Sequence, residues 1–511
     1  MQFKQRRGDR DGAFSGTRPS RAIIDIGSNT VRLVIYGGSP RAPAVLLNEK
    51  VTARLGRDIA NKGVLAEEAI ALAMRGLSRF VLLLEDLRIE DVETVATAAV
   101  REASNGGEFI ATLRALGLAP RVLSGEEEAV LSASGVAGAF REARGYVADL
   151  GGGSLELVDL ASAQASNPVS LPLGALRLPD FRSKGDKSDS AMRERIEQVI
   201  RNEGGARASG ETLYLVGGTW RAMAVFAMQM QEHPLSDPHG LSLGREAAKA
   251  LIAALASENF ESLKARKRIS SMRAEKLPNA AILLSAMLRV LEPCGLVFSS
   301  WGLREGLLYD RLGPEDRAQD PLLAGIAAFA EQRGAPATLA AQMAGWSAGA
   351  VPANTQGGER LRLAATMLAL ASMQIEPNIR LPQAVDWALH KRWIGIEAHE
   401  RAMLGAAVAA NGNELDLPPA ISALASDKAL GEAICWGLAV RLARRLGGGS
   451  RRSLQVSRLF TREDALVLRL ARSHEALFGV PVEKDMKLLS GRLGCDYRVE
   501  IVEEDALYET D

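Results

Sequence analysis

Residues 145–160 read GYVADLGGGSLELVDL and predict a β-hairpin whose bend carries almost no side chains. An apolar run ends in Asp149, a glycine-rich bend follows, and the second strand alternates in character through Glu156. Bare backbone N–H groups in such a bend can turn inward and surround an anion. Asp149 and Glu156 flank the bend at equivalent heights, so cross-strand pairing can direct both carboxylates to one point beside that anion.

Two carboxylates beside a bound phosphate would repel it unless a hard divalent cation lay between them. The hairpin therefore predicts Mg²⁺, with Mn²⁺ as the alternative, held by Asp149 and Glu156. The other interpretation, which the hairpin alone leaves open, is a glycine-rich turn with two solvated acids.

The chain contains this hairpin twice. Residues 22–36 read AIIDIGSNTVRLVIY and can be laid on the hairpin above so that Asp25 falls on Asp149. Arg32 then falls where Glu156 stands, so one hairpin offers a cation where the other offers an anion. Internal duplication of this kind predicts two related lobes that close on a shared cleft.

A second candidate anion site follows the strand that ends at residue 96. Thr97, Arg101 and Asn105 stand at four-residue steps and share one face of a helix start. This spacing predicts an oxyanion at a helix N-terminus, with Arg101 as a bidentate clamp. The alternative pairs Arg101 with Glu102 or Glu108 on the surface.

The stretch SGEEEAVLSASGVAGAF begins with Ser124, which can cap a helix that carries three glutamates in its first turn. Glu128 is the best candidate to turn inward, because it lies within the helix and the small Ala129 leaves room above a cleft. A carboxylate near a bound phosphate could orient and deprotonate an attacking water. The alternative is that all three glutamates only cap the helix and remain solvated.

Two weaker signals lie further along. The strand at residues 211–218 ends in Gly217 and Gly218, and with Thr219 as a helix cap it predicts another phosphate nest or simply close packing. Basic residues gather at 264–276, where they could line a polyanion track or form a solvated helix face.

Composition limits the class of protein. A chain of 511 residues is too long to fold around one hydrophobic core. Its 62 basic and 62 acidic residues balance, so there is no net charge that would attract nucleic acid or an acidic membrane. The three cysteines lack metal-ligand spacing, and no apolar stretch is long enough to span a bilayer. The N-terminus lacks the apolar core of a secretory signal, so we expect a cytoplasmic protein.

The chain order predicts five parts. We expect a disordered tail at 1–20, lobe I at 21–140, lobe II at 141–312, a helical domain at 320–446 and a small α+β domain at 452–511. Linkers are predicted at residues 314–321, which begin and end in proline, and at 447–450, which read GGGS.

Seven motifs occur in a fixed order: DIGSNTVRLVIY, ATAAVREASNG, SGEEEA, DLGGGSLELV, SLPLGALRL, LVGGTWRA and SSWGLREGLL. In this order they resemble the exopolyphosphatase and guanosine pentaphosphate phosphohydrolase family of the actin, sugar-kinase and heat-shock ATPase superfamily. The resemblance covers residues 21–312. It implies an α/β fold of two actin-like (ribonuclease H-like) lobes with an interlobe cleft, followed by an all-α degenerate His-Asp-like domain and a small α+β domain.

The resemblance also implies roles for the residues. Glu128 matches the catalytic acid, and Asp149 and Glu156 match the Mg²⁺ ligands, to which we add Asp25 from the first hairpin. The predicted phosphate-binding residues are Gly27, Ser28, Asn29, Thr30, Arg101, Gly151, Gly152, Gly153, Ser154, Gly217 and Gly218. The family often has threonine where this chain has Leu155, which removes one hydroxyl and neither carboxylate.

The helical domain departs from its relatives. The stretch LAATMLALASMQI has no His-Asp pair, and His390 and His399 cannot complete a usual metal quartet. We therefore expect a domain without its own chemistry that serves dimerisation and extends the polyanion groove.

The leading functional prediction is removal of the terminal phosphate of inorganic polyphosphate, assisted by Mg²⁺, by a homodimer that binds neither nucleic acid nor membrane. The alternatives are a guanosine pentaphosphate 5′-phosphohydrolase at the same site, a non-catalytic sensor of polyphosphate or guanosine tetraphosphate, and an ATP-dependent kinase or ATPase.

Overall fold

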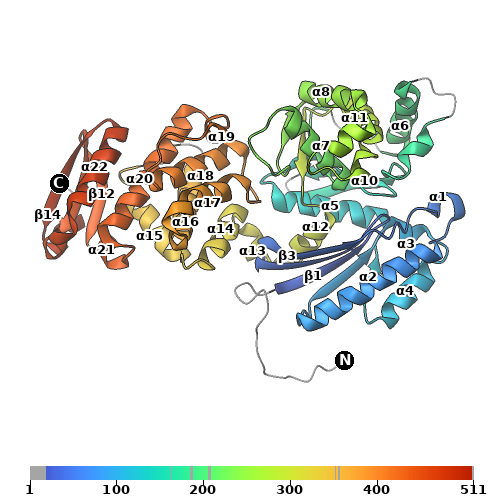
Figure 1. The fold of residues 1–511 in the computed structure, drawn as a ribbon, viewed down its shortest axis with the longest axis horizontal. Helices are drawn as coiled ribbons and strands as arrows, with labels where there is room; N and C mark the ends of the chain where they lie inside the picture. The colour runs from blue at the N-terminus through green and yellow to red at the C-terminus, as the bar shows by residue number, and fades with distance from the viewer. Residues whose placement is uncertain are drawn as a thin grey trace. The chain divides into compact units, whose positions relative to one another are not determined.

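The computed structural model in Figure 1 describes residues 19–161, 163–183, 188–204, 209–351, 353–354 and 357–508. The chain forms two compact units: Met1–Glu232 with Pro238–Gln319, and His233–Asp237 with Asp320–Asp511. The predicted disordered tail lies outside the described residues except for Pro19 and Ser20, which begin the first strand. In the part of the chain that the structure describes, no helix combines the length and apolar character that crossing a membrane requires.

The first unit contains two mixed sheets (Figure 1). The first sheet has the order β3-β2-β1-β4-β5, in which β1, β2 and β3 are antiparallel neighbours and β4 and β5 run parallel to β1. Its strands are β1 (Pro19–Ile26), β2 (Val31–Ser39), β3 (Ala42–Val51), β4 (Val92–Ala96) and β5 (Pro120–Val122). Helices α2 (Glu67–Asp86) and α4 (Gly106–Ala115) supply apolar residues to one core with β1 and β2.

The second sheet has the order β10-β11-β9-β6-β7-β8. Its strands are β6 (Arg144–Leu150), β7 (Leu155–Ala161), β8 (Gln164–Leu171), β9 (Thr212–Val216), β10 (Ser242–Gly244) and β11 (Gly295–Ser299). Read as β8-β7-β6-β9-β11, it repeats the order and strand directions of the first sheet. The duplication is therefore confirmed, down to the register that pairs Asp25 with Arg32 and Asp149 with Glu156.

Two helices of this unit pack against each other, α5 (Gly125–Ala139) and α12 (Leu303–Asp310) (Figure 1). Small residues let their backbones approach closely: a Cβ added to Gly306 would lie 1.8 Å from the carbonyl oxygen of Leu131. Leu131 and Leu307 join the apolar cluster that includes Ile23 and Val95 of the first sheet. This packing holds α5, and therefore Glu128, in a fixed position between the sheets.

The remaining helices of the first unit are α1 (Ile59–Lys62), α3 (Ala98–Glu102), α6 (Asp189–Glu203), α7 (Gly218–Met230), α8 (Arg245–Ser257), α9 (Phe260–Ala265), α10 (Ser271–Ala274), α11 (Leu277–Val290) and α13 (Pro314–Ala318). Helix α13 lies within the stretch that we predicted to be a linker. Strand β8 ends at Leu171, because the chain then turns behind the bend of the β6–β7 hairpin. Helix α7 begins at Gly218 with Gly217 as its N-cap, so the predicted Thr219 cap is wrong.

The second unit consists of helices and one small sheet. Its helices are α14 (Pro321–Glu331), α15 (Ala337–Ser347), α16 (Gly358–Ala371), α17 (Pro377–His390), α18 (Ala398–Asn411), α19 (Pro419–Ser422), α20 (Asp427–Gly447), α21 (Arg451–Gln455) and α22 (Val480–Leu493). The strands are β12 (Ser457–Arg462), β13 (Ala465–Ala471) and β14 (Asp496–Val502), in the order β12-β13-β14. The predicted joint at 447–450 contains the end of α20, where Gly448 adopts a left-handed conformation.

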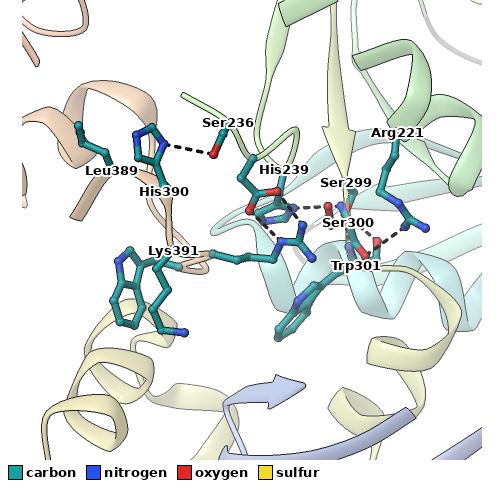
Figure 2. A network of polar contacts seen from close by, with 12 residues as sticks. Arg221, Ser236, His239, Ser299, Ser300, Trp301, Leu389, His390 and Lys391 are labelled. Carbon is teal, nitrogen blue, oxygen red and sulfur yellow. Dashed lines mark hydrogen bonds and ion pairs between the residues drawn. The ribbon is translucent and has the colours of Figure 1, made fainter. Parts of the chain in front are cut away.

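Both histidines of the second unit that we considered as ligands have protein partners. His390 Nδ1 lies 3.2 Å from the Oγ atom of Ser236 (Figure 2). Ser236 belongs to the segment His233–Asp237, which is part of this second unit. His399 is exposed and lies 3.3 Å from Glu397.

Candidate active site

The bends of the two duplicated hairpins face each other. In each bend the first glycine donates to the fourth residue: Gly27 to the Thr30 carbonyl at 3.1 Å, and Gly151 to the Ser154 carbonyl at 3.0 Å. A Cβ added to Gly152 would lie 3.0 Å from Ser28 Cβ, so the bends nearly touch. The predicted pair of glycine-bent loops is therefore present, with one loop from each lobe.

The segment after β8 supports the second bend from behind. The N–H groups of Ala175 and Leu176 donate to the carbonyls of Gly151 and Gly152 at 3.0 and 2.9 Å. Gly174 allows this approach, because a Cβ there would lie 2.2 Å from the Gly153 carbonyl carbon. Since C=O and N–H point in opposite directions across a trans peptide, the N–H groups of Gly152 and Gly153 point away from this segment. On that other side they can donate hydrogen bonds to an anion.

Four carboxylates lie beside these bends, those of Asp25, Glu128, Asp149 and Glu156. Glu128 is 8% exposed and turned inward as predicted, while Ser124 and Glu127 form a capping box at the start of α5. Ser132, one turn further along α5, donates a hydrogen bond to Asp149 Oδ2. Ser170 Oγ donates to Glu156 Oε1 at 2.9 Å. Helix α5 and strand β8 thus position the acids that the sequence singled out.

The carboxylates raise one another's pKa values. Burial raises the pKa of Glu128 well above its ordinary value, and Glu156 and Asp149 add to this effect while Arg101 opposes it. Burial and Asp149 raise the pKa of Glu156 to about 7. Burial also raises the pKa values of Asp25 and Asp149. Burial is the largest cause of each of these four shifts.

Two observations bear on the predicted metal. Among the residues that the structure describes, no three His, Cys, Asp or Glu side chains form a ready metal cluster, so Asp25, Asp149 and Glu156 do not make a three-ligand cage. Glu128 Oε2 and Glu156 Oε2 are nevertheless buried without a hydrogen-bond partner. Mg²⁺ usually binds through one or two carboxylates, waters and substrate phosphate. Paired acids with orphaned oxygens fit that mode of binding.

Asp25, Glu128 and Asp149 line a cavity of about 680 Å³ together with the loops, whereas Glu156 is not among its lining residues. Seven basic residues also line it: Arg32, Lys50, Arg54, Arg221, Arg273, Lys276 and Arg304. Burial lowers the pKa of Arg221 to about 9, with Arg273 and Arg304 as the next causes. Guanidinium groups crowded in this way favour a ligand with several negative charges.

A hydrogen-bond network fixes the turn that carries Arg304. Figure 2 shows the Ser300 N–H donating to His239 Nδ1 at 3.1 Å and Arg221 near the Ser300 carbonyl. At the start of α12, the Gly302 N–H donates to Glu305 Oε2 at 3.2 Å. These bonds hold Arg304 3.8 Å from Asp25, on the cavity wall.

Arg101 does not lie where we predicted. It is not among the residues that line the cavity; its Nη1 donates to the Leu123 carbonyl at 2.7 Å and lies 3.5 Å from Glu128 Oε2. Helix α3 ends at Glu102, and Asn105 instead bonds both backbone groups of Leu65. The predicted three-residue face is therefore wrong, and Arg101 contacts the candidate catalytic acid.

The other predicted phosphate-binding residues line the cavity: Gly27, Ser28, Asn29, Thr30, Gly151, Gly152, Gly153, Ser154, Gly217 and Gly218. Gly218 also has a packing role, because an added Cβ would lie 2.3 Å from the Arg273 guanidinium. Sequence reasoning missed Arg221 and Arg304 as site residues. Both arginines lie inside motifs that carry the family resemblance, LVGGTWRA and SSWGLREGLL. Their place in these motifs could have identified them as site residues.

Comparisons with known proteins identify the family and the fold. The model of the Ppx/GppA phosphatase family matches residues 34–315. The Aquifex aeolicus PPX-GPPA enzyme is 28% identical with a TM-score of 0.50, over 57% of this chain and 98% of its own. An exopolyphosphatase from Cytophaga hutchinsonii, 24% identical over 56% of this chain and 96% of its own, shares the fold with a TM-score of 0.51.

A curated relative extends the similarity to yeast. Retrograde regulation protein 2 of Saccharomyces cerevisiae is 29% identical over 334 residues, or 59% of this chain. The match spans 57% of the length of that relative.

Proposed function

Since the chain belongs to the Ppx/GppA phosphatase family, we propose that it is an exopolyphosphatase that hydrolyses the terminal phosphate of inorganic polyphosphate. The observation that carries this proposal is the lining of the large cavity. Glycine bends and buried acids lie together in it, and seven basic side chains surround them. A linear polyanion with a small terminal group matches this distribution of charge.

The terminal phosphate would bind between the two bends, through N–H groups such as those of Gly152 and Gly153. The guanidinium groups of Arg221, Arg273 and Arg304 would bind the following phosphates. Both sets of donors are fixed before the substrate arrives, so little reorganisation is needed when charge shifts in the transition state.

Glu128 would orient the attacking water and accept its proton. Its burial and raised pKa make it a stronger proton acceptor than a solvated glutamate, and Arg101 at 3.5 Å limits the rise in pKa. The water oxygen bonds to the terminal phosphorus and the bond to the bridging oxygen breaks, so the electron pair leaves with the shortened chain.

Asp149 and Glu156 would hold Mg²⁺, with Asp25 nearby. When bound, the ion supplies positive charge that neutralises the phosphoryl oxygens. Ser132 and Ser170 fix the two carboxylates through the hydrogen bonds described above.

The experiment is phosphate release from polyphosphate of defined length, with Mg²⁺ and with excess EDTA, by the wild-type protein and Glu128→Gln. Metal-dependent release by the wild type and loss of turnover in the variant support the proposal. Equal release by both proteins contradicts the role of Glu128, and binding of polyphosphate without any release supports a non-catalytic sensor.

One observation favours guanosine pentaphosphate as a second substrate. Phe260 is 42% exposed and lines the large cavity, where a phenyl ring offers nothing to a plain phosphate chain. A nucleobase could stack on it. Values of kcat/KM for the nucleotide and for polyphosphate, measured side by side, decide between the substrates. A cytoplasmic homodimer remains our prediction from the sequence.

A further inference from the structure

A second, smaller cavity lies behind the glycine bends. Its volume is about 180 Å³, and it shares Ser28, Ala98 and Gly153 with the large cavity. The small cavity therefore adjoins the position where the terminal phosphate would bind. Several of its other lining residues are exposed, among them Arg57 and Glu102, so it opens to solvent.

The wall between the two cavities is thin. A Cβ on Gly153 would lie 3.2 Å from both Ala98 Cβ and Ser28 Oγ, closer than ordinary van der Waals contact, so only small residues fit together there. Ser28 and Ala98 belong to the first lobe and Gly153 to the second. A small change in the distance between the lobes would therefore open a passage.

The charges of the two cavities differ. Basic side chains dominate the large cavity, whereas the small cavity has Arg57 and Arg177 balanced by Glu102 and Asp180. Arg177 forms an ion pair with Glu102, and this pair also joins the second lobe to the first. A site with balanced charge can pass an anion without holding it tightly.

We propose that the small cavity is the exit site for the orthophosphate product. This inference rests on the proposed exopolyphosphatase function. After cleavage, the orthophosphate would lie beneath the new end of the polyphosphate, which still fills the large cavity. The orthophosphate and the shortened polyphosphate repel each other there. Exit through the thin wall releases the product while the chain stays bound, and the Arg177–Glu102 pair lines the path.

The test separates cleavage from release. In rapid-mixing experiments with long-chain polyphosphate and Mg²⁺, quenched samples report the phosphate cleaved, and a fluorescent phosphate-binding reporter reports the phosphate free in solution. The proteins are the wild type, Arg177→Glu, and the charge-swapped double variant Arg177→Glu with Glu102→Arg. Because the pair is partly exposed, we expect each variant to keep the wild-type fold.

Arg177→Glu puts a cluster of negative charge in the exit. We expect first-turnover cleavage at the wild-type rate, free phosphate that appears several-fold later, and recovery of prompt release in the double variant. Release in step with cleavage in Arg177→Glu, or delay that the double variant retains, would overturn the exit role. Absence of cleavage by the wild type would instead overturn the exopolyphosphatase proposal.

Discussion

Replacing Glu156 by glutamine should stabilise the first unit at pH 8 when divalent cations are absent. Glu156 is 1% exposed, and burial together with Asp149 raises its pKa from 4.5 to about 7. A glutamine carbonyl oxygen would accept the same hydrogen bond from Ser170. The substitution therefore removes a buried negative charge with little change in shape.

The two pKa values set the magnitude. Between pH 4.5 and about 7 the folded protein binds more protons at Glu156 than the unfolded chain does, so the free energy of unfolding falls as the pH rises. Relative to a group that does not titrate, Glu156 lowers the free energy of unfolding by about 3 kcal/mol at pH 8 and by less than about 1 kcal/mol at pH 5. The gain from the substitution should therefore be about 2 kcal/mol larger at pH 8, or about 3 °C in melting temperature for a unit of this size.

The assay is differential scanning calorimetry of the full chain in EDTA at pH 5 and pH 8. Glu126→Gln is the matched control, since Glu126 is an exposed glutamate in the first turn of α5, and its substitution should change stability by less than about 0.5 kcal/mol. An equal gain for Glu156→Gln at both pH values, or a loss at pH 8, would refute the reasoning from a buried charge.

Further predictions concern activity. Glu128→Gln should lower kcat by about 10²–10⁴-fold and leave polyphosphate binding nearly intact in a filter assay, and a wild-type kcat would remove Glu128 as the base. Mg²⁺ should raise the melting temperature of the wild type at pH 8 more than that of Glu156→Gln, and equal shifts would place the ion elsewhere. Arg221→Met should raise KM for polyphosphate by about tenfold or more and flatten its salt dependence. Gly174→Ala should lower kcat with unchanged circular dichroism, because its Cβ would lie 2.2 Å from the Gly153 carbonyl carbon and displace the bend, and full activity would show that the bend tolerates movement.

The hairpins and their paired acids could be predicted from sequence because they are local. Strand alternation around a glycine bend fixes the register that sets Asp149 opposite Glu156, and the duplicated pattern predicts two related lobes. The inward direction of Glu128 could also be predicted from the sequence. Ser124 and Glu127 form the capping box at the start of α5, so Glu128 is the next residue within the helix.

Long-range packing explains the failures. Arg101 has the right spacing for a phosphate clamp, but the Leu123 carbonyl, 22 residues away, accepts its hydrogen bond and draws it to Glu128. The support of the glycine bend is also long-range, because the N–H groups of Ala175 and Leu176 donate to the carbonyls of Gly151 and Gly152. Arg221 and Arg304 meet in the cavity because β9 and β11 are neighbours in the sheet, which no local pattern reveals.

The most direct measurement is anomalous diffraction from crystals of Glu128→Gln grown with Mn²⁺ and tripolyphosphate. We expect one manganese peak bound to Asp149 or Glu156, with the terminal phosphate between the two glycine bends. Manganese outside the large cavity, or phosphate away from both bends, would contradict the assignment of this cavity as a phosphohydrolase site.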